Sequence, residues 1–384
     1  MKIYDVIIIG AGSVGVPCAL ACAQAGLKTG VIDSLSSVGQ GQNKTAIGGV
    51  RATHSDIAKI TIAKRSLEIF STWEKLYGDD IGFKKGGYCF PAYTEKDEKN
   101  FKELLVIQKQ FGLNIDWLEK DKLIELVNGI NEQNLKGGTY SPDDGSASPL
   151  LAINAFYEKA INLKADFYFN EKVTDIILKN NTVRQVKTDK DIYITKTVIN
   201  AAGAFARQVG AMAGIDVPVI PDSHEAGITE PIKQFIVPMI VDMRPYPGSK
   251  NFYFYQNKEG QVLFCLTPAP IIEGTDTRST SDFLPLVAKR IREIFPTLLK
   301  IKIRRVWRGL YPMTPDGIPV VGKVKEVEGF INAVGMCGQG FMLGPGLGEL
   351  LSRLVTCNLT ESDVNVLDKF SLYGDYAQCR EFFL

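Results

Sequence analysis

Four residues near the start of the chain have the types and spacing of a site that binds the pyrophosphate and ribose of a dinucleotide. Gly10, Gly12 and Gly15 separate an apolar run from an apolar, helix-forming segment, and Asp33 follows a second apolar run. The first glycine permits a tight turn, the second lets backbone approach a pyrophosphate, and the third allows close helix packing. The helix N-terminus offers N–H donors, and an acid at this distance can accept hydrogen bonds from ribose hydroxyls.

The elements that would hold these residues follow from the hydrophobic pattern. Residues 3–9 predict a buried strand and residues 28–32 a second one, with a helix between them. Residues 6–27 carry no charge, so a membrane helix or a signal peptide is an alternative. The glycines and Pro17 would disrupt a membrane span, and Asp5 stands where a signal peptide carries positive charge. A strand, a turn and a packed helix explain the segment better.

Composition narrows the functional classes. The chain has 384 residues, of which 45% are hydrophobic and 23% charged, and its formal net charge is +1. This balance gives no general electrostatic reason to bind nucleic acid or an anionic membrane. Seven cysteines without a CxxC pair and two histidines predict no metal site and a reduced, cytoplasmic chain.

A second glycine-rich element lies near the C-terminus. Residues 329–344 predict an apolar strand that enters a glycine-rich turn, and residues 345–355 predict a helix. A helix N-terminus at this place could favour negative charge on a reduced flavin ring. A structural turn is the alternative, and the first fingerprint alone does not separate FAD from NAD, so an NAD-dependent dehydrogenase stays open.

Several further motifs, in this order and spacing, resemble the amine-oxidising flavoproteins of D-amino-acid oxidase type over nearly the whole chain. Within that family the chain is most similar to sarcosine oxidases and to the catalytic β subunits of dye-linked proline or hydroxyproline dehydrogenases. Besides the Gly10 turn, the motifs are GGVR at 48–51, GGYCF at 86–90, YSPDDG at 140–145, VINAAGAFA at 198–206, WRGLY at 307–311 and the loop at 335–344.

The resemblance implies an α/β fold with a discontinuous, Rossmann-type FAD-binding domain and an inserted, mixed-sheet α+β substrate domain. The FAD-binding domain would comprise residues 1–85, 140–215 and 315–384, and the substrate-binding domain residues 86–139 and 216–314. By analogy with the family, the expected contacts of FAD are Gly10, Gly12, Gly15, Asp33, Ser34, Asn43, Lys44, Thr45, Gly48, Gly49, Val173, Ala202, Gly203, Gly309, Gly338, Gln339, Gly340, Phe341 and Met342.

Two residues are expected to meet the substrate. Arg51 matches the arginine that holds the substrate carboxylate in monomeric sarcosine oxidase, and a planar guanidinium suits that anion. The alternative is that Arg51 pairs with a carboxylate of the protein. Tyr253 matches a substrate-facing tyrosine, although the aromatic run 251–255 also reads as a half-buried strand. His54 is expected to be solvated or near a helix cap, and the role of His224 is left open.

The departures from the family pattern bear on the reaction. Glycine oxidase and D-amino-acid oxidase both use arginines at the positions where this chain has Tyr311 and Gly338. The glycine-oxidase mode of binding the substrate carboxylate is therefore not expected here. Gly309 replaces the cysteine that attaches FAD in monomeric sarcosine oxidase, so the cofactor should be noncovalent. Met342 replaces one lysine of that enzyme, and Phe264 or Cys265 replaces the lysine that activates oxygen. Loss of a cation beside the flavin should slow the reaction with oxygen.

The resulting expectation is FAD-dependent oxidation of a secondary or cyclic amino acid, of the sarcosine, proline or hydroxyproline type, to its imine by hydride transfer to flavin N5. Electrons would pass to a partner subunit or another acceptor, with no nucleic acid and no membrane span involved. One alternative is a true oxidase of sarcosine or glycine that makes hydrogen peroxide. Another is a flavin-bearing subunit for electron relay or assembly without amine chemistry of its own.

The pattern also predicts helices over 55–77, 95–112, 121–127, 149–163 and 281–295. Residues 166–199 predict a meander of strands, and residues 218–247 a turn-rich entry into the inserted domain.

Overall fold

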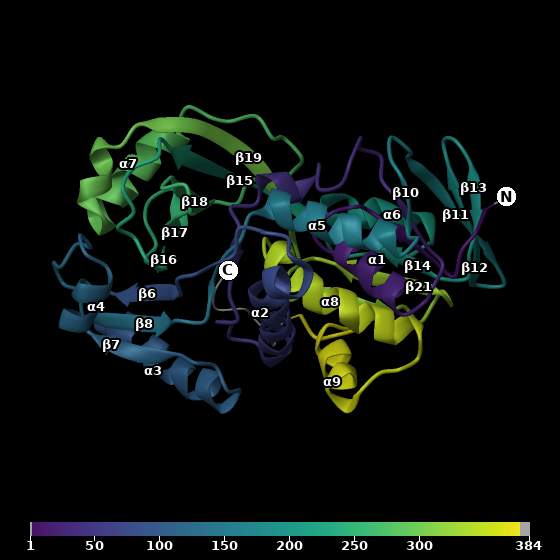
Figure 1. Cartoon of the computed structure of the whole chain (residues 1–384), viewed down its shortest axis with the longest axis horizontal. Coiled ribbons are helices and arrows are strands. Elements are labelled where there is room, and N and C mark those ends of the chain that lie inside the picture. The colour runs from purple at the N-terminus through teal and green to yellow at the C-terminus, as the bar shows by residue number, and fades with distance from the viewer. Residues whose placement is uncertain (1, 377–384) are drawn as a thin grey trace.

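Two large β-sheets lie at opposite ends of the long axis of the molecule (Figure 1). The computed structural model describes residues 2–376. One sheet has six strands in the order β10-β3-β2-β14-β21-β20, and the other has eight in the order β19-β15-β18-β17-β16-β6-β8-β7. The fold is therefore α/β, as the sequence predicts.

The six-stranded sheet is parallel except at one edge. Its parallel strands are β10 (Asp166–Tyr168), β3 (Thr29–Ile32), β2 (Val6–Ile9), β14 (Val198–Asn200) and β21 (Phe330–Val334), and the antiparallel edge strand is β20 (Val320–Lys323). Both faces are covered, which explains why β2 is apolar at every position. Val6 and Ile8 pack toward one core, and Ile7 and Ile9 toward another.

Helices cover one face of this sheet and a small sheet covers the other. α1 (Gly15–Gln24) packs against α5 (Pro149–Asn162) and α8 (Gly340–Val355). The opposite face carries α6 (Ala206–Met212) and a four-stranded sheet of β1 (Lys2–Ile3), β11 (Val173–Lys179), β12 (Thr182–Thr188) and β13 (Ile192–Ile194).

Two predictions about these strands are wrong in detail. Residues 3–9 do not form one strand, because Ile3 pairs with β13 whereas Val6 begins β2 in the parallel sheet. The break lies at Asp5, whose carboxylate accepts a hydrogen bond from Lys28 N at 2.8 Å. The predicted meander over 166–199 is confined to β11, β12 and β13, because its first and last strands join the parallel sheet.

The eight-stranded sheet is mixed. Its strands are β6 (Tyr88–Ala92), β7 (Asp116–Glu119), β8 (Gly137–Ser141), β15 (Ile220–Thr229), β16 (Met239–Asp242), β17 (Ser249–Gln256), β18 (Val262–Pro268) and β19 (Ile303–Met313). All neighbours are antiparallel except β16 and β6. The prediction of a turn-rich segment over 218–247 is wrong for residues 220–229 and 239–242, which are β15 and β16, and holds for residues 230–238, which have no regular structure. β15 pairs with β19 along its length, and Pro221 lies opposite Pro312 near the end of the ladder.

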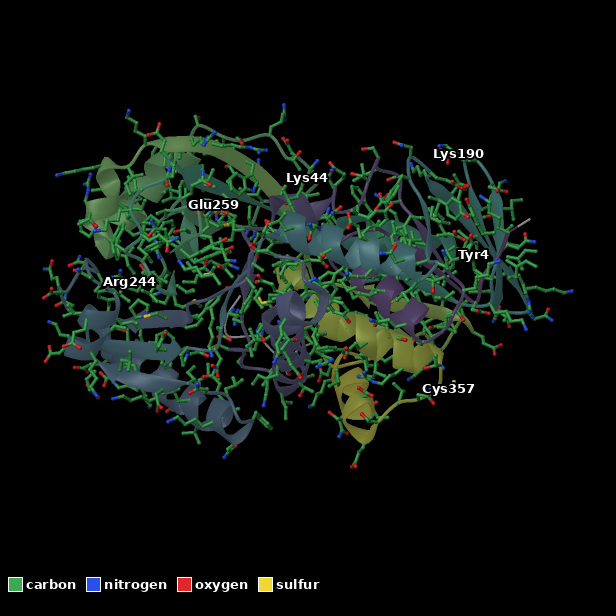
Figure 2. All side chains as sticks on the ribbon, viewed as in Figure 1. Tyr4, Lys44, Lys190, Arg244, Glu259 and Cys357 are labelled. Atoms are coloured by element: carbon green, nitrogen blue, oxygen red, sulfur yellow. The ribbon has the colours of Figure 1, made fainter. Side chains whose placement is uncertain are left out.

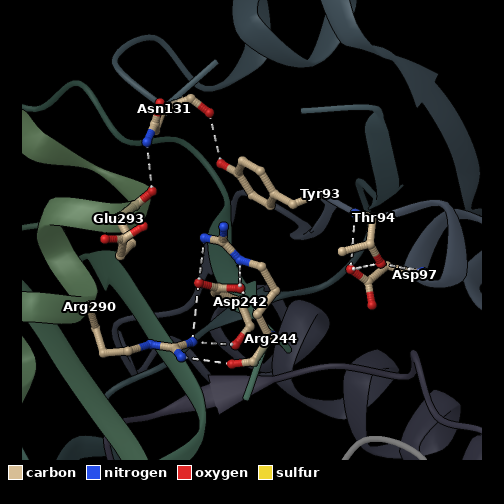
Figure 3. Close-up of polar contacts among 8 residues, drawn as sticks. All are labelled: Tyr93, Thr94, Asp97, Asn131, Asp242, Arg244, Arg290 and Glu293. Carbon is tan, nitrogen blue, oxygen red and sulfur yellow. Dashed lines mark hydrogen bonds and ion pairs between the residues drawn. The ribbon is translucent and has the colours of Figure 1, made fainter. Parts of the chain in front are cut away.

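A buried ion cluster fastens one helix to this sheet (Figure 3). Asp242 of β16 pairs with Arg290 of α7 (Phe283–Ile294) at 3.1 Å and with Arg244 at 2.8 Å, and Arg244 lies over the ring of Tyr93. Asp242 and Arg290 are each 1% exposed, so each charge requires the other.

The remaining elements lie between and around the sheets (Figure 1). They are α2 (Ile57–Tyr77), α3 (Glu95–Gln110), α4 (Lys120–Leu126), α9 (Glu361–Lys369), the short helices η1 (Gln42–Thr45), η2 (Gly203–Phe205) and η3 (Pro296–Lys300), and a three-stranded sheet of β4 (Gly49–Val50), β9 (Gly145–Ser146) and β5 (Lys84–Lys85). The predicted helices are present with ends shifted by a few residues. Within residues 2–376, no helix has both the length and the apolar character that a membrane crossing requires.

Candidate functional site

A cavity of about 540 Å³ is lined by residues of both large sheets. Gly10, Gly12 and Asp33 line one part of it, at the carboxyl ends of β2 and β3. Arg51 and Tyr253 line it from the small sheet and from the eight-stranded sheet. A cavity at the carboxyl ends of parallel strands is where open α/β sheets bind nucleotides.

The glycine turn after β2 has the geometry that a phosphate group requires. Gly10 has φ +110°, and a Cβ on it would lie 2.5 Å from Ala201 O. A Cβ on Gly15 would lie 1.8 Å from Gly10 O, so the start of α1 can approach the turn only with glycine there. Gly12 lines the cavity with no atom within 4 Å of its hypothetical Cβ. The turn therefore offers open space beside a helix N-terminus.

Asp33 and Asn43 fix the loops around this turn. Asp33 accepts hydrogen bonds from Ala11 N at 2.7 Å and from Leu35 N at 2.8 Å. Asn43 is 1% exposed, accepts from Ser13 Oγ at 2.9 Å and donates to Pro149 O at the same distance. These bonds tie η1 to the glycine turn and to α5.

Most of the expected FAD contacts line the cavity. Besides Gly10, Gly12, Asp33 and Asn43, they are Ser34, Thr45, Gly48, Gly49, Val173, Ala202, Gly203, Gly338, Gln339, Gly340, Phe341 and Met342. Gly15 does not line the cavity, because it packs against the backbone of Gly10. Lys44 differs from the expectation, because its side chain is exposed and its Nζ lies 3.4 Å from Gln40 Oε1 (Figure 2). Gly309 also lies behind the lining, where a Cβ would be 2.4 Å from Thr45 Oγ1, so this position has no room for a side chain.

The second glycine-rich loop brings the N-terminus of α8 to the cavity. Gly335, Cys337 and Gly338 all have positive φ, and a Cβ on Gly338 would lie 2.1 Å from Tyr311 Cε2. α8 begins at Gly340, earlier than predicted, and includes Pro345. Cys337 Sγ contacts Gly335 O at 3.2 Å and Thr314 Oγ1 at 3.3 Å, which agrees with a packing role.

Arg51 is only 7% exposed and lines the cavity directly after β4. Its Nη1 donates to Thr53 O and lies 3.3 Å from His54 Nδ1. The guanidinium lies over the ring of Phe90 at 6.0 Å. The expectation of a solvated His54 is wrong, because the residue is completely buried and its carbonyl accepts from Gln108 of α3 at 3.0 Å.

An aromatic cluster that the sequence did not reveal lies beside Tyr253. The hydroxyls of Tyr253 and Tyr311 are 2.6 Å apart, and the ring of Tyr311 stacks on His224 with centroids 3.7 Å apart. His224 Nε2 lies 3.0 Å from Asp222 Oδ2. Burial raises the pKa of both tyrosines well above the ordinary value, and burial lowers the pKa of His224 although Asp222 opposes it. At neutral pH the cluster therefore presents neutral phenols and a neutral imidazole.

The strand β16 and its continuation have two different faces. Met239, Val241 and Met243 line the cavity, whereas Asp242 and Arg244 form the ion cluster on α7. Tyr88 and Phe90 of β6 extend the same wall. This wall is mainly apolar.

Phe264 and Cys265, one of which takes the place of the expected oxygen-activating lysine, have different surroundings. Phe264 stacks on Phe283 in the core beneath α7. Cys265 is buried beside Tyr253 and Tyr311, and burial raises the pKa of its thiol to about 11. Neither position supplies a cation.

These observations test the fit of FAD. The cradle at Gly10 and Gly12 suits a pyrophosphate, Asp33 and Ser34 line the cavity where they would meet the ribose, and the N-terminus of α8 borders the cavity, where it would face the ring system. Within residues 2–376, no group of three or more His, Cys, Asp or Glu side chains could hold a metal ion.

Comparison with known proteins decides the family. The family model DAO, described as FAD dependent oxidoreductase, matches residues 5–354. The chain belongs to this family. Its cofactor is therefore FAD, and the NAD-dependent alternative is set aside. Members that the chain resembles include oxidases and dehydrogenases of amino acids, so the DAO-family protein described here is an oxidoreductase of that kind.

Three relatives illustrate the range. The structure of L-proline dehydrogenase from P. horikoshii has a TM-score of 0.89 and 31% identity, covering 96% of this chain and 97% of that one. Hydrogen cyanide synthase subunit HcnC of Pseudomonas protegens is 25% identical over 92% of this chain and 93% of its own length. Human mitochondrial dimethylglycine dehydrogenase is 26% identical over 97% of this chain, which spans only 44% of that longer protein.

Proposed function

We propose that this DAO-family protein oxidises a secondary or cyclic amino acid to its imine and passes the electrons to a partner subunit or another acceptor rather than to oxygen. The observation that carries the proposal is that Arg51 and Tyr253 line the same cavity as the glycine turn and the N-terminus of α8. Bound FAD would supply the redox chemistry by accepting the hydride. The protein must hold the donor carbon in place and exclude water.

Arg51 would bind the substrate carboxylate. A guanidinium presents several N–H donors in one plane and can grip a carboxylate with two parallel bonds. Thr53 and His54 hold Nη1, which fixes the plane of the group. The other charged side chains along the described lining are Asp33, Glu171 and Lys172, and backbone hydrogen bonding between Glu171 and Asp33 places these at the nucleotide end.

The apolar wall would receive the rest of the substrate. Met239, Val241 and Met243 offer no partner for a second carboxylate or a charged side chain. An N-methyl group or a pyrrolidine ring fits such a surface, whereas the neutral hydroxyls of Tyr253 and Tyr311 can meet the amine. The wall thus supports an amino acid with one carboxylate and an apolar remainder.

The electron acceptor is proposed from the surroundings of Cys265. Superoxide formation at a reduced flavin is helped by a nearby cation, and the buried residues Phe264 and Cys265 bring none. The similarity to an L-proline dehydrogenase and to a protein named as a subunit supports a dehydrogenase with a partner. We also propose that FAD is held by residues 1–85, 140–215 and 315–384 and the substrate by 86–139 and 216–314.

An anaerobic screen of amino acids tests this function. Proline, hydroxyproline and sarcosine should bleach the flavin absorbance of the purified protein, and aspartate should not. Substrate-reduced protein should then reoxidise far more slowly in air than with an artificial dye, measured by stopped flow. Reoxidation by oxygen as fast as by the dye, with formation of hydrogen peroxide, would reject the dehydrogenase.

A true oxidase is the second candidate, favoured by 26% identity to a glycine oxidase of Geobacillus kaustophilus over 94% of this chain and 95% of that protein. Peroxide production with glycine or sarcosine would select it. A flavin that no amino acid bleaches would instead select the relay subunit.

A further inference from the structure

We propose that Asp144 is the positioning residue of the carboxylate-binding site: its buried carboxylate fixes the loop that carries and orients Arg51. The inference rests on the proposed function, in which Arg51 holds the substrate. Asp144 belongs to the sequence motif YSPDDG, but no role follows from that motif itself.

The small sheet brings Asp144 to the Arg51 loop. Val50 of β4 pairs with Gly145 of β9, so the residues that follow Val50 and precede Gly145 lie together. A Cβ on Gly145 would lie 2.2 Å from Lys84 O, so the third strand closes directly against this position. Asp144 lies 93 positions after Arg51 in the sequence, and the two become neighbours only through this pairing, which explains why the sequence pattern alone did not connect them.

Both oxygens of the Asp144 carboxylate accept hydrogen bonds from the residues that follow Arg51. Oδ1 accepts from Ala52 N at 2.7 Å and Oδ2 accepts from Thr53 Oγ1 at 2.5 Å. The main-chain oxygen of Asp144 accepts from Gly87 N at 2.7 Å, just before the cavity-lining strand β6. One residue therefore joins the loop of Arg51 to the start of β6.

The link continues from the loop to the guanidinium. Thr53, whose hydroxyl bonds to Asp144, uses its carbonyl to accept from Arg51 Nη1. His54 adds a second contact to the same nitrogen, at 3.3 Å, and is itself anchored by Gln108. The orientation of Arg51 thus depends on the position of the Thr53 carbonyl, and that position depends on Asp144.

The electrostatics agree with this role. Asp144 is 1% exposed, and burial raises the pKa of its carboxyl to about 6, although Thr53, Ala52 and Arg51 lower it. A carboxylate kept charged in a buried site needs these partners. The charged and titratable groups on the surrounding elements are Arg51 and His54 after β4, Lys84 and Lys85 on β5, Tyr88 on β6, Tyr140 on β8 and the neighbouring Asp143.

The test measures binding of pyrrole-2-carboxylate, a planar analogue of proline with no hydrogen to give as hydride, through the shift in flavin absorbance. Asp144→Asn should raise its Kd about tenfold, the loss of about one bond to a charged group. Thr53→Val should also raise the Kd of pyrrole-2-carboxylate, whereas Thr53→Ser, which keeps the hydroxyl, should bind it as tightly as the wild type. Pyrrole-2-carboxamide should bind equally to all variants.

A double-mutant cycle separates positioning from a general structural effect. In an Arg51→Ala background, Asp144→Asn and Thr53→Val should change the Kd less than twofold. The inference would be overturned if Asp144→Asn and Thr53→Val raised the Kd by the same factor with and without Arg51, or if the single variants left the Kd unchanged. If Asp144→Asn does not fold, as judged by flavin content and Tm, the Thr53 pair decides. Amino acids that bleach the wild-type flavin show that the proposed function holds whatever the cycle gives. A wild type that does not bind pyrrole-2-carboxylate overturns the inference about Asp144, and the proposed function is rejected only if no amino acid bleaches the flavin.

Discussion

Replacing Arg51 tests the site most directly, because this guanidinium lines the cavity beside its apolar wall. Two bonds from a guanidinium to a carboxylate contribute about 1.5–3 kcal/mol each. Arg51→Lys keeps the charge but not the planar fork, so it should lose about one bond and raise the half-saturating substrate concentration about 10- to 150-fold. Arg51→Ala should lose both bonds, about 3–6 kcal/mol in total, and raise it about 150-fold or more.

The assay is an anaerobic titration of the oxidised protein, followed by bleaching of the flavin absorbance. The control is Arg65→Ala, which removes an arginine of α2 that pairs with Glu349 at 2.8 Å and does not line the cavity. This variant should titrate like the wild type. An Arg51→Ala protein that is half-reduced at the wild-type concentration would refute the role of Arg51 as carboxylate anchor.

Three other perturbations follow from the geometry. Gly338→Ala should weaken FAD binding more than tenfold in a flavin-release titration, because its Cβ would lie 2.1 Å from the Tyr311 ring. The control Gly26→Ala also has positive φ, +81°, but has open space around its Cβ and should keep its flavin. Equal losses of flavin in the two variants would contradict this reasoning. His224→Ala should lower the free energy of unfolding by about 1.5–3 kcal/mol, since it removes the hydrogen bond of a neutral imidazole to a buried carboxylate, and a calorimetric Tm equal to wild type would exclude that cost. Because the folded-state pKa of Asp144 is raised to about 6, its contribution to stability is largest below the unfolded value of 3.8 and falls as pH rises toward 6, by an amount on the order of 3 kcal/mol. Urea unfolding of wild type and Asp144→Asn between pH 4 and 7 checks this, and a constant difference would count against it.

The nucleotide end could be predicted because its determinants are local. Gly10, Gly12 and Gly15 lie within six positions, and the apolar runs on either side set the strand and the helix. What escaped prediction depends on chain segments that meet only after folding. The break lies at Asp5, which bonds to Lys28, and β15 is held by β19, whose paired residues lie 74 to 93 positions further on in the chain.

The same distinction applies to the site. The motif at 48–51 suggested Arg51, but the residues that orient it, among them Thr53 and Asp144, become neighbours only through the pairing of β4 with β9. His54 lies among polar residues in the sequence, and it is covered by α3, whose Gln108 is 54 positions further along the chain and bonds to the His54 carbonyl. Sequence spacing therefore indicated the residue expected to bind the substrate better than the residues that hold it in place.

The two faces of β16 have a consequence for how this enzyme could diversify. Met239 and Val241 line the cavity, whereas Asp242, next on the same strand, carries the ion cluster that fastens α7. Exchanges at the two inward positions can reshape the chamber while the fastening behind it stays intact. Selection for a new amine could therefore proceed by single replacements along one strand, with little cost to the scaffold's integrity.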